Sequence, residues 1–379
     1  MRILIAPDSF KESLSAPDVA SAIAAGVRDA LPHADIVCVP MADGGEGSLD
    51  AVLAATSGER RQAQVKNANN EPYTASWGWL GGGKAFIEMA EAAGLEQIPA
   101  GRRDPLSATS YGVGQLIQHA VDAGARHIVL GLGGSATNDA GAGLLQALGA
   151  RLLDSEGNDL ALGGAALQKL ATLDLARLDS RLADVEFQLA VDVDNPLCGP
   201  SGASAIFGPQ KGATPDDVAL LDAALRNFAR VCALHFNKDE QNIPGMGAAG
   251  GLGFAVKTCF NASFRPGVEL VAELAGLEQA MAGTALVFTG EGRMDAQTML
   301  GKTPAGVARY ARKHAIPVIA LVGSLGEGYE ALYEAGITAA FSLTPGPMTL
   351  EQACDRSAIY LRQRASDCIR LWLSGSRTQ

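Results

Sequence analysis

Both ends of the chain alternate short apolar strands with amphipathic helices. Residues 2–6 form a continuous apolar run, which is typical of a strand buried on both faces of a parallel sheet. A helix follows, with Ser15 as its expected N-cap and Pro17 in its first turn. A strand at 36–41 and a helix at 48–55 come next. The last hundred residues add three more strands with helices between them, at 285–289, 317–322 and 339–343, and a long closing helix at 350–373.

Five strands that alternate with helices predict a flavodoxin-like, doubly wound parallel sheet. The middle of the chain is less regular, although it also contains strand and helix patterns. We therefore predict an α/β fold in which a sheet domain of residues 1–60 and 281–379 is interrupted by an inserted α/β domain of residues 61–280. The active site is expected in the cleft between them. A plain division near Asp154 is the alternative, because periodicity cannot distinguish the two arrangements.

Composition limits the classes of function. The 379 residues are 47% hydrophobic, which is enough to bury two cores. A net charge of −11 disfavours a nucleic-acid or anionic-membrane surface, since both need clustered cations. The chain has no apolar run of spanning length, its first apolar run is too short for a signal peptide, and its six cysteines form no CxxC pair. We expect a cytoplasmic protein that binds neither membrane nor nucleic acid; its oligomeric state is undetermined.

Polar, glycine-rich clusters follow the predicted strands and helices. They occupy residues 7–13, 41–48, 131–141, 192–196 with 207–212, and 289–295 with 301–304. Ligands of open parallel sheets bind beyond the carboxyl ends of the strands, where glycines and helix N-termini can approach phosphate oxygens. Nearby carboxylates suit Mg²⁺, which bridges phosphates, and Lys11, Lys211 and Lys302 could neutralise transferring oxygens.

Each cluster also has a structural explanation. Glycine-rich turns are routine in α/β folds, and Asp43 or Asp139 could serve only as a helix cap. Most sequence motifs of known nucleotide-binding proteins do not match this chain. Gly301-Lys302-Thr303 resembles the end of a Walker A loop, but Ala296 stands where its first glycine should be. Gly131–Ala136 is a weak dinucleotide-binding match, and the chain has no protein-kinase HRD or DFG motif.

Taken together, the clusters resemble the bacterial glycerate kinase family of type 1. The resemblance covers nearly the whole chain and is carried by seven strings in one order, at residues 6–11, 42–47, 133–139, 192–197, 207–212, 247–253 and 289–293. It implies an ATP- and Mg²⁺-dependent kinase of D-glycerate, with a flavodoxin-like domain interrupted by a second α/β domain. It further implies a role in sugar-acid and glyoxylate catabolism, with 2-phosphoglycerate favoured over 3-phosphoglycerate as the product.

Roles for the matched residues follow from their chemistry. Asp192, Lys11 and Arg293 are predicted to be catalytic, and Asp192 with Asp194 to hold Mg²⁺ or to accept the proton of the substrate hydroxyl. An Asx-type turn into Asn195-Pro196 is the structural alternative for these two aspartates. Substrate contacts are predicted for Asp8, Ser9, Asp43, Glu291 and Asp295. Nucleotide or phosphate contacts are predicted for Gly133, Gly134, Ser135, Thr137, Asn138, Lys211, Gly250 and Gly251.

Three rival functions remain open from the sequence. The same loops could serve an ATP-dependent kinase of another small hydroxy acid or polyol. A dinucleotide-dependent oxidoreductase could use Gly131–Ala136. A nucleotide-binding sensor without turnover would present similar phosphate loops.

Overall fold

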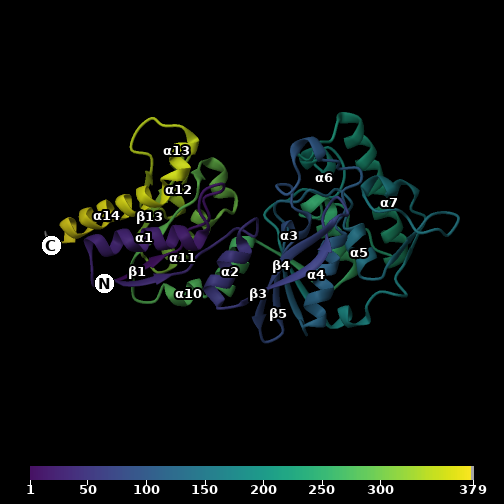
Figure 1. Cartoon of the computed structure of the whole chain (residues 1–379), viewed down its shortest axis with the longest axis horizontal. Coiled ribbons are helices and arrows are strands. Elements are labelled where there is room, and N and C mark those ends of the chain that lie inside the picture. The colour runs from purple at the N-terminus through teal and green to yellow at the C-terminus, as the bar shows by residue number, and fades with distance from the viewer. Residues whose placement is uncertain (377–379) are drawn as a thin grey trace. The chain divides into compact units, whose positions relative to one another are not determined.

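The computed structural model describes residues 1–376 and divides into two compact α/β units (Figure 1). The first unit comprises Met1–Asp43, Asp50–Gly58 and Pro266–Gln379, and the second comprises Gly44–Leu49 and Glu59–Arg265. The chain thus leaves the first unit and returns to it.

A five-stranded sheet forms the centre of the first unit. Its spatial order is β2 (Asp35–Cys38), β1 (Arg2–Ile5), β11 (Thr284–Thr289), β13 (Val318–Val322) and β15 (Ala339–Ser342), and all neighbours are parallel. The strands therefore lie in the order 2-1-3-4-5, which is the flavodoxin-like arrangement. Ile3, Leu4 and Ile5 are fully buried, as a central strand covered on both faces requires. The predicted sheet is confirmed.

Helices α1 (Ala16–Ala30), α11 (Thr303–Lys313) and α14 (Ser357–Ser376) pack against strands of this sheet. The other helices are α2 (Ser48–Thr56), whose first two residues belong to the second unit, α9 (Gly267–Leu274), α10 (Leu277–Ala280), α12 (Ala331–Ala335) and α13 (Leu350–Asp355). The short strands β12 (Arg293–Met294) and β14 (Ser324–Leu325) form a separate parallel pair. Helices α1 and α14 lie side by side (Figure 1), and Arg362 of α14 forms an ion pair with Asp29 of α1 at 2.6 Å.

The single closing helix expected at 350–373 is wrong in one respect, because the chain breaks into α13 and α14 at Arg356. The Ser357 hydroxyl donates to the carbonyl of Cys354 and lies 2.7 Å from the Ser13 hydroxyl. A serine that bonds to the local backbone competes with the helical hydrogen bonds, which accounts for the break.

A mixed six-stranded sheet organises the second unit. Its order is β10 (Ala262–Arg265), β9 (Glu186–Ala190), β6 (His127–Gly131), β5 (Lys84–Glu88), β4 (Pro72–Gly81) and β3 (Glu59–Lys66). The first four strands are parallel, and β3, β4 and β5 pair antiparallel. The remaining elements are α3 (Ala90–Ala93), α4 (Tyr111–Asp122), α5 (Ala142–Ala147), α6 (Ala203–Phe207), α7 (Pro215–Phe236), α8 (Leu252–Cys259) and the small pair β7 (Arg151–Leu153) and β8 (Thr172–Asp174).

The boundary expected between residues 280 and 281 lies instead between Arg265 and Pro266. Helix α9 follows this boundary and belongs to the first unit. Its Val268 is fully buried and packs directly against Gly306 of α11. Apolar packing of this kind leaves no periodicity signal that distinguishes one core from another, so sequence reasoning grouped these residues with the inserted domain.

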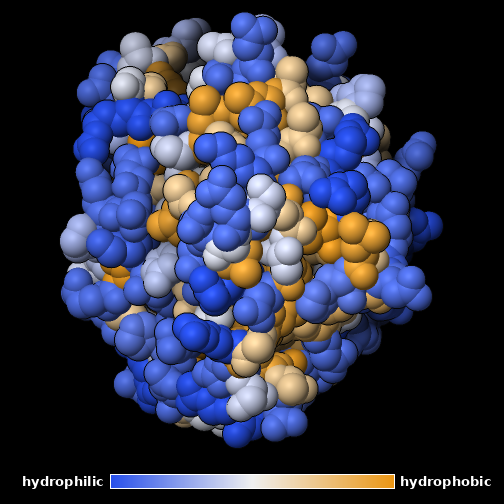
Figure 2. All heavy atoms as spheres, turned by 90° about the vertical axis from the view of Figure 1, so that its right-hand side faces the viewer, coloured by the Kyte–Doolittle hydropathy of each residue, from blue (hydrophilic) through white to orange (hydrophobic). Residues whose placement is uncertain are grey.

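None of the helices among the described residues is long and apolar enough to cross a bilayer. Figure 2 shows a face of the second unit on which apolar atoms stand in small groups among hydrophilic ones. The large apolar side chains exposed in this unit are Ile206, Leu234 and Ile243. Scattered apolar exposure of this kind is ordinary for a globular protein.

Candidate active site

In the first unit, three carboxylates follow three neighbouring parallel strands. Asp8 comes after β1, Asp43 after β2 and Glu291 after β11. The Asp8 N–H donates to the carbonyl of Gly290 at 2.9 Å, which aligns the first and last of these loops. The carboxyl ends of parallel strands form the ligand-binding edge of an open α/β sheet, and here that edge carries acidic side chains.

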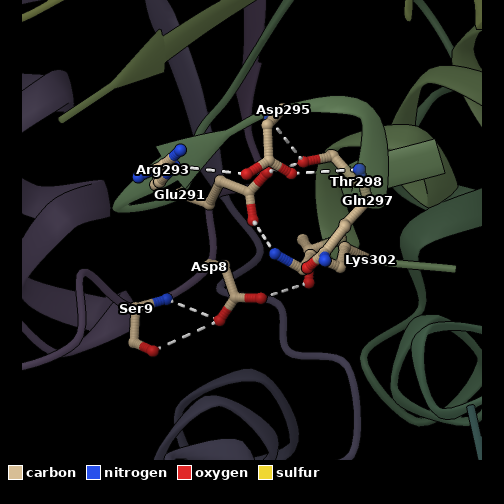
Figure 3. Close-up of polar contacts among 9 residues, drawn as sticks. Asp8, Ser9, Glu291, Arg293, Asp295, Gln297, Thr298 and Lys302 are labelled. Atoms are coloured by element: carbon tan, nitrogen blue, oxygen red, sulfur yellow. Dashed lines mark hydrogen bonds and ion pairs between the residues drawn. The ribbon is translucent and has the colours of Figure 1, made fainter. Parts of the chain in front are cut away.

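Asp8 is a buried carboxyl group held by neutral donors. One of its oxygens accepts hydrogen bonds from the Ser9 N–H at 2.7 Å and the Ser9 hydroxyl at 3.3 Å (Figure 3). The other accepts from the Thr303 hydroxyl at 2.5 Å. Burial, and then the negative charge of Asp43, raise the pKa of Asp8 to about 7, against the lowering effect of the Thr303 hydrogen bond.

Glu291 is the second buried carboxyl group, and both of its oxygens are occupied. One accepts from the Thr298 hydroxyl at 2.5 Å, and the other lies 3.7 Å from the ammonium of Lys302 (Figure 3). Burial raises the pKa of Glu291 to about 7, while Thr298 and Lys302 act in the opposite direction. The cluster therefore joins two carboxyls of raised pKa to one cation.

Arg293 and Asp295 border this cluster. Asp295 accepts from the Gln297 N–H at 3.0 Å, and its own N–H donates to the Thr298 hydroxyl at 3.2 Å, so Asp295 helps to position the partner of Glu291. Arg293 is largely exposed and pairs with Asp295 at 3.2 Å (Figure 3). Lys11 is also exposed. The structure thus brings Asp8, Ser9, Asp43, Glu291 and Asp295 together, with Arg293 at the border.

The raised pKa of Asp8 predicts a pH-dependent stability. A carboxyl whose pKa is higher in the folded state stabilises the protein fully below its unfolded value near 4, and this contribution is lost as the pH rises through about 7. Asp8→Asn, which stays neutral, should therefore gain stability relative to wild type between pH 4.5 and 8, by on the order of 3 kcal/mol. Thermal melting of both proteins across this range, without substrates, measures the difference. A difference independent of pH would contradict the prediction.

In the second unit, the side chain of Lys211, which follows α6, contacts the glycine-rich loop after β6. Its side chain is only 1% exposed, and its ammonium donates to the Ser135 hydroxyl at 2.8 Å and the Thr137 carbonyl at 2.7 Å. Burial lowers the pKa of Lys211 to about 7, opposed by the negative charge of Asp139. The hydrogen bonds of Lys211 therefore connect two residues of the glycine-rich loop, Ser135 and Thr137.

Asp139 is a buried cap. Its carboxylate accepts hydrogen bonds from the backbone N–H and hydroxyl of Ser110, both at 2.8 Å, and from the N–H groups of Gly141 and Gly143. These contacts support the cap that sequence analysis left open for Asp139. The neighbouring Thr137 and Asn138 are fully buried, and their Oγ1 and Oδ1 atoms, respectively, have no hydrogen-bond partner among residues 1–376.

The segment Gly44–Leu49 packs against the same loop. The buried Glu88 carboxylate, at the end of β5, accepts a hydrogen bond from the Leu49 N–H at the start of α2. A Cβ atom at Gly133 would lie 2.5 Å from the Cα of Gly45, so the two backbones touch and no side chain fits between them. Glu88 and these glycines keep two of the predicted phosphate loops in contact.

Comparison with known proteins identifies the family of the chain. The model of the glycerate kinase family matches residues 3–373. A glycerate kinase of Bacillus subtilis is 46% identical over 368 residues, covering 97% of this chain and 96% of the relative. A glycerate 2-kinase of Escherichia coli is 49% identical over 354 residues, covering 93% of each. The chain belongs to the glycerate kinase family.

A solved structure supports the fold of this chain. The crystal structure of a candidate glycerate kinase from Salmonella typhimurium LT2 matches with a TM-score of 0.90 and 46% identity, covering 100% of this chain and 99% of the other. The resemblance found in the sequence is confirmed, and the chain is a phosphotransferase whose kinase activity implies ATP and glycerate as substrates.

Asp192 and Asp194 follow β9 at the carboxyl end of the second sheet. Both are exposed, while Val193 between them is half-buried. Among the described residues no group of three or more His, Cys, Asp or Glu side chains could hold a metal ion. Mg²⁺ usually takes one or two carboxylates and completes its shell with phosphate oxygens and water, so the assignment of these two aspartates to Mg²⁺ is chemically reasonable and stays a prediction.

Sequence reasoning missed three candidate site residues, namely Glu88, Thr298 and Thr303. Glu88 could have been noticed, because it is a charged residue inside an otherwise apolar strand. The two threonines carry no such signal, since their importance depends on which carboxylate they contact.

Proposed function

We propose that this chain transfers the γ-phosphoryl group of Mg²⁺-ATP to the 2-hydroxyl of D-glycerate. The observation that carries the proposal is the cluster of the buried Asp8 and Glu291 with the half-buried Lys302 at the ligand edge of the first sheet. Glycerate offers hydroxyl groups to acceptors and a carboxylate to cations, and this cluster contains both partners. The 2-kinase activity named for the Escherichia coli relative supports the choice of hydroxyl.

Glycerate would bind to the first unit. Asp8, Asp43 and Ser9 would face its hydroxyl groups, whereas Lys302, with the exposed Lys11 and Arg293, would neutralise its carboxylate and the arriving phosphoryl group. Positioning and charge stabilisation account for most of the catalysis of phosphoryl transfer, so the buried hydrogen bonds to Asp8 and Glu291 would contribute by keeping these groups fixed.

ATP would bind to the second unit. Its phosphates would lie against Gly133, Gly134 and Ser135. The loop would be held in place by the hydrogen bonds of Lys211 to Ser135 and Thr137 and by the close contact of Gly250 with the Thr137 carbonyl. Asp192 and Asp194 would hold Mg²⁺, which neutralises phosphate charge when bound. We further propose that the product is phosphoglycerate formed in the cytoplasm during sugar-acid and glyoxylate catabolism.

Product analysis tests this function. With Mg²⁺-ATP, D-glycerate should have the highest kcat/KM in a panel that includes L-glycerate, lactate, tartrate and glycerol. The phosphorus NMR spectrum of the product should be that of 2-phosphoglycerate. A spectrum of 3-phosphoglycerate would overturn the assignment of the hydroxyl, and preference for another acceptor would overturn the choice of D-glycerate.

A further inference from the structure

The two buried carboxyls of the first unit differ in the charge of their partners. Glu291 accepts a hydrogen bond from the Thr298 hydroxyl and faces the Lys302 ammonium, a cation that favours its ionised form and so makes it a weaker base. Asp8 receives hydrogen bonds only from Ser9 and Thr303, and no lysine or arginine among the described residues forms an ion pair with it. A carboxylate can accept about four hydrogen bonds, so Asp8 retains capacity for another proton donor.

The surroundings of Asp8 also favour proton uptake. It is 9% exposed, and the charged groups that face it are the carboxylates of Asp43, after β2, and Glu291, after β11, with Lys302 beside Glu291. Burial and negative neighbours make a carboxylate a stronger base, and a general base works best when its pKa lies near the operating pH. The pKa of Asp8, raised to about 7, meets this requirement. Asp192, by contrast, is exposed.

We propose that Asp8 is the general base that accepts the proton of the glycerate hydroxyl during phosphoryl transfer, an inference that rests on the proposed function. As the hydroxyl oxygen forms its bond to the γ-phosphorus, its O–H bond breaks and the proton passes to Asp8. The bond from the γ-phosphorus to the bridging oxygen breaks, and its electron pair leaves with ADP. In this assignment Asp192 has only the role of holding the metal ion.

Replacing Thr303 tests whether Asp8 takes part in the reaction, because a purely structural Asp8 would leave the pH dependence of kcat unchanged. The hydroxyl of Thr303 stabilises the ionised form of Asp8, so its loss should raise the pKa of Asp8 further. The acidic limb of the kcat–pH profile should therefore move to higher pH in Thr303→Val. Thr298→Val is the matched control, because it removes an equally short hydrogen bond from Glu291 instead, and it should not move this limb upward.

The experiment measures ADP release and phosphoglycerate formation between pH 5 and 9, with both substrates saturating. Asp8→Asn should lower kcat by roughly 10²- to 10⁴-fold, while the dissociation constant for a fluorescent ADP analogue changes less than twofold. If Asp8→Asn does not fold, the two threonine variants carry the test alone.

Two results would overturn the assignment of Asp8 while leaving the proposed function intact. One is an Asp8→Asn enzyme that keeps kcat within threefold of wild type. The other is a Thr303→Val profile that does not shift, or that shifts no more than that of Thr298→Val. A wild-type enzyme that transfers no phosphate to glycerate at any pH would instead overturn the proposed function, and this inference with it.

Discussion

Replacing Lys211 by methionine is expected to lower kcat/KM for ATP by roughly 10²-fold or more. The ammonium of Lys211 is the donor that holds the Ser135 hydroxyl and the Thr137 carbonyl together beneath the glycine-rich loop. Methionine fills a similar volume but donates nothing, so both acceptors lose their partner. The buried Thr137 carbonyl, left unpaired, costs ~1–3 kcal/mol, and the loop can relieve that cost only by moving.

Lys257→Met is the matched control for Lys211→Met. Lys257 lies in the same unit and donates to the carbonyl of Ala262 at 2.6 Å, so its replacement also removes a lysine-to-carbonyl hydrogen bond, but one outside the glycine-rich clusters. Initial rates at varied ATP concentration, together with thermal melting, separate a loop effect from general destabilisation. A Lys211→Met enzyme with the kcat/KM of Lys257→Met would show that the buried lysine has no part in ATP use.

Replacing Gly250 by alanine is expected to lower the free energy of unfolding by about 3 kcal/mol or more and to abolish most activity. Gly250 has a φ of 65°, and a Cβ atom there would lie 2.0 Å from the Thr137 carbonyl oxygen. Left-handed backbone alone costs alanine roughly 1–2 kcal/mol. The overlap adds to this cost, because Thr137 is fully buried and its carbonyl is already bonded to Lys211.

Gly157→Ala isolates the backbone contribution to the effect at Gly250. Gly157 also has a positive φ, of 84°, but a Cβ atom there would meet no other atom within 4 Å. Its replacement should cost only about 1 kcal/mol and leave the activity unchanged. Denaturant unfolding of both variants gives the comparison. Equal losses of stability would mean that the close approach of Gly250 to Thr137 contributes nothing.

The sequence by itself determined the sheet of the first unit and the family. Buried strands and amphipathic helices have different periods, so their alternation could be read directly, and it led to the flavodoxin-like sheet. The family followed from seven short strings in a fixed order, which needs no knowledge of what those strings contact. For the candidate site, the sequence nominated loops and acidic residues, since glycine and carboxylate mark ligand edges wherever they follow a strand.

Only the tertiary structure decided which of these residues have partners. Asp8 and Thr303 are 295 positions apart, and Lys211 and Ser135 are 76 apart, so their hydrogen bonds depend on strand order rather than on local pattern. Burial separated Asp8 and Glu291, whose pKa values are raised, from the exposed Asp192 and Asp194. Packing also set the boundary at Pro266, because Val268 joins the core containing Gly306. The desolvation of a side chain and its contacts depend on segments that are distant in the chain, so they cannot be predicted from a local sequence period.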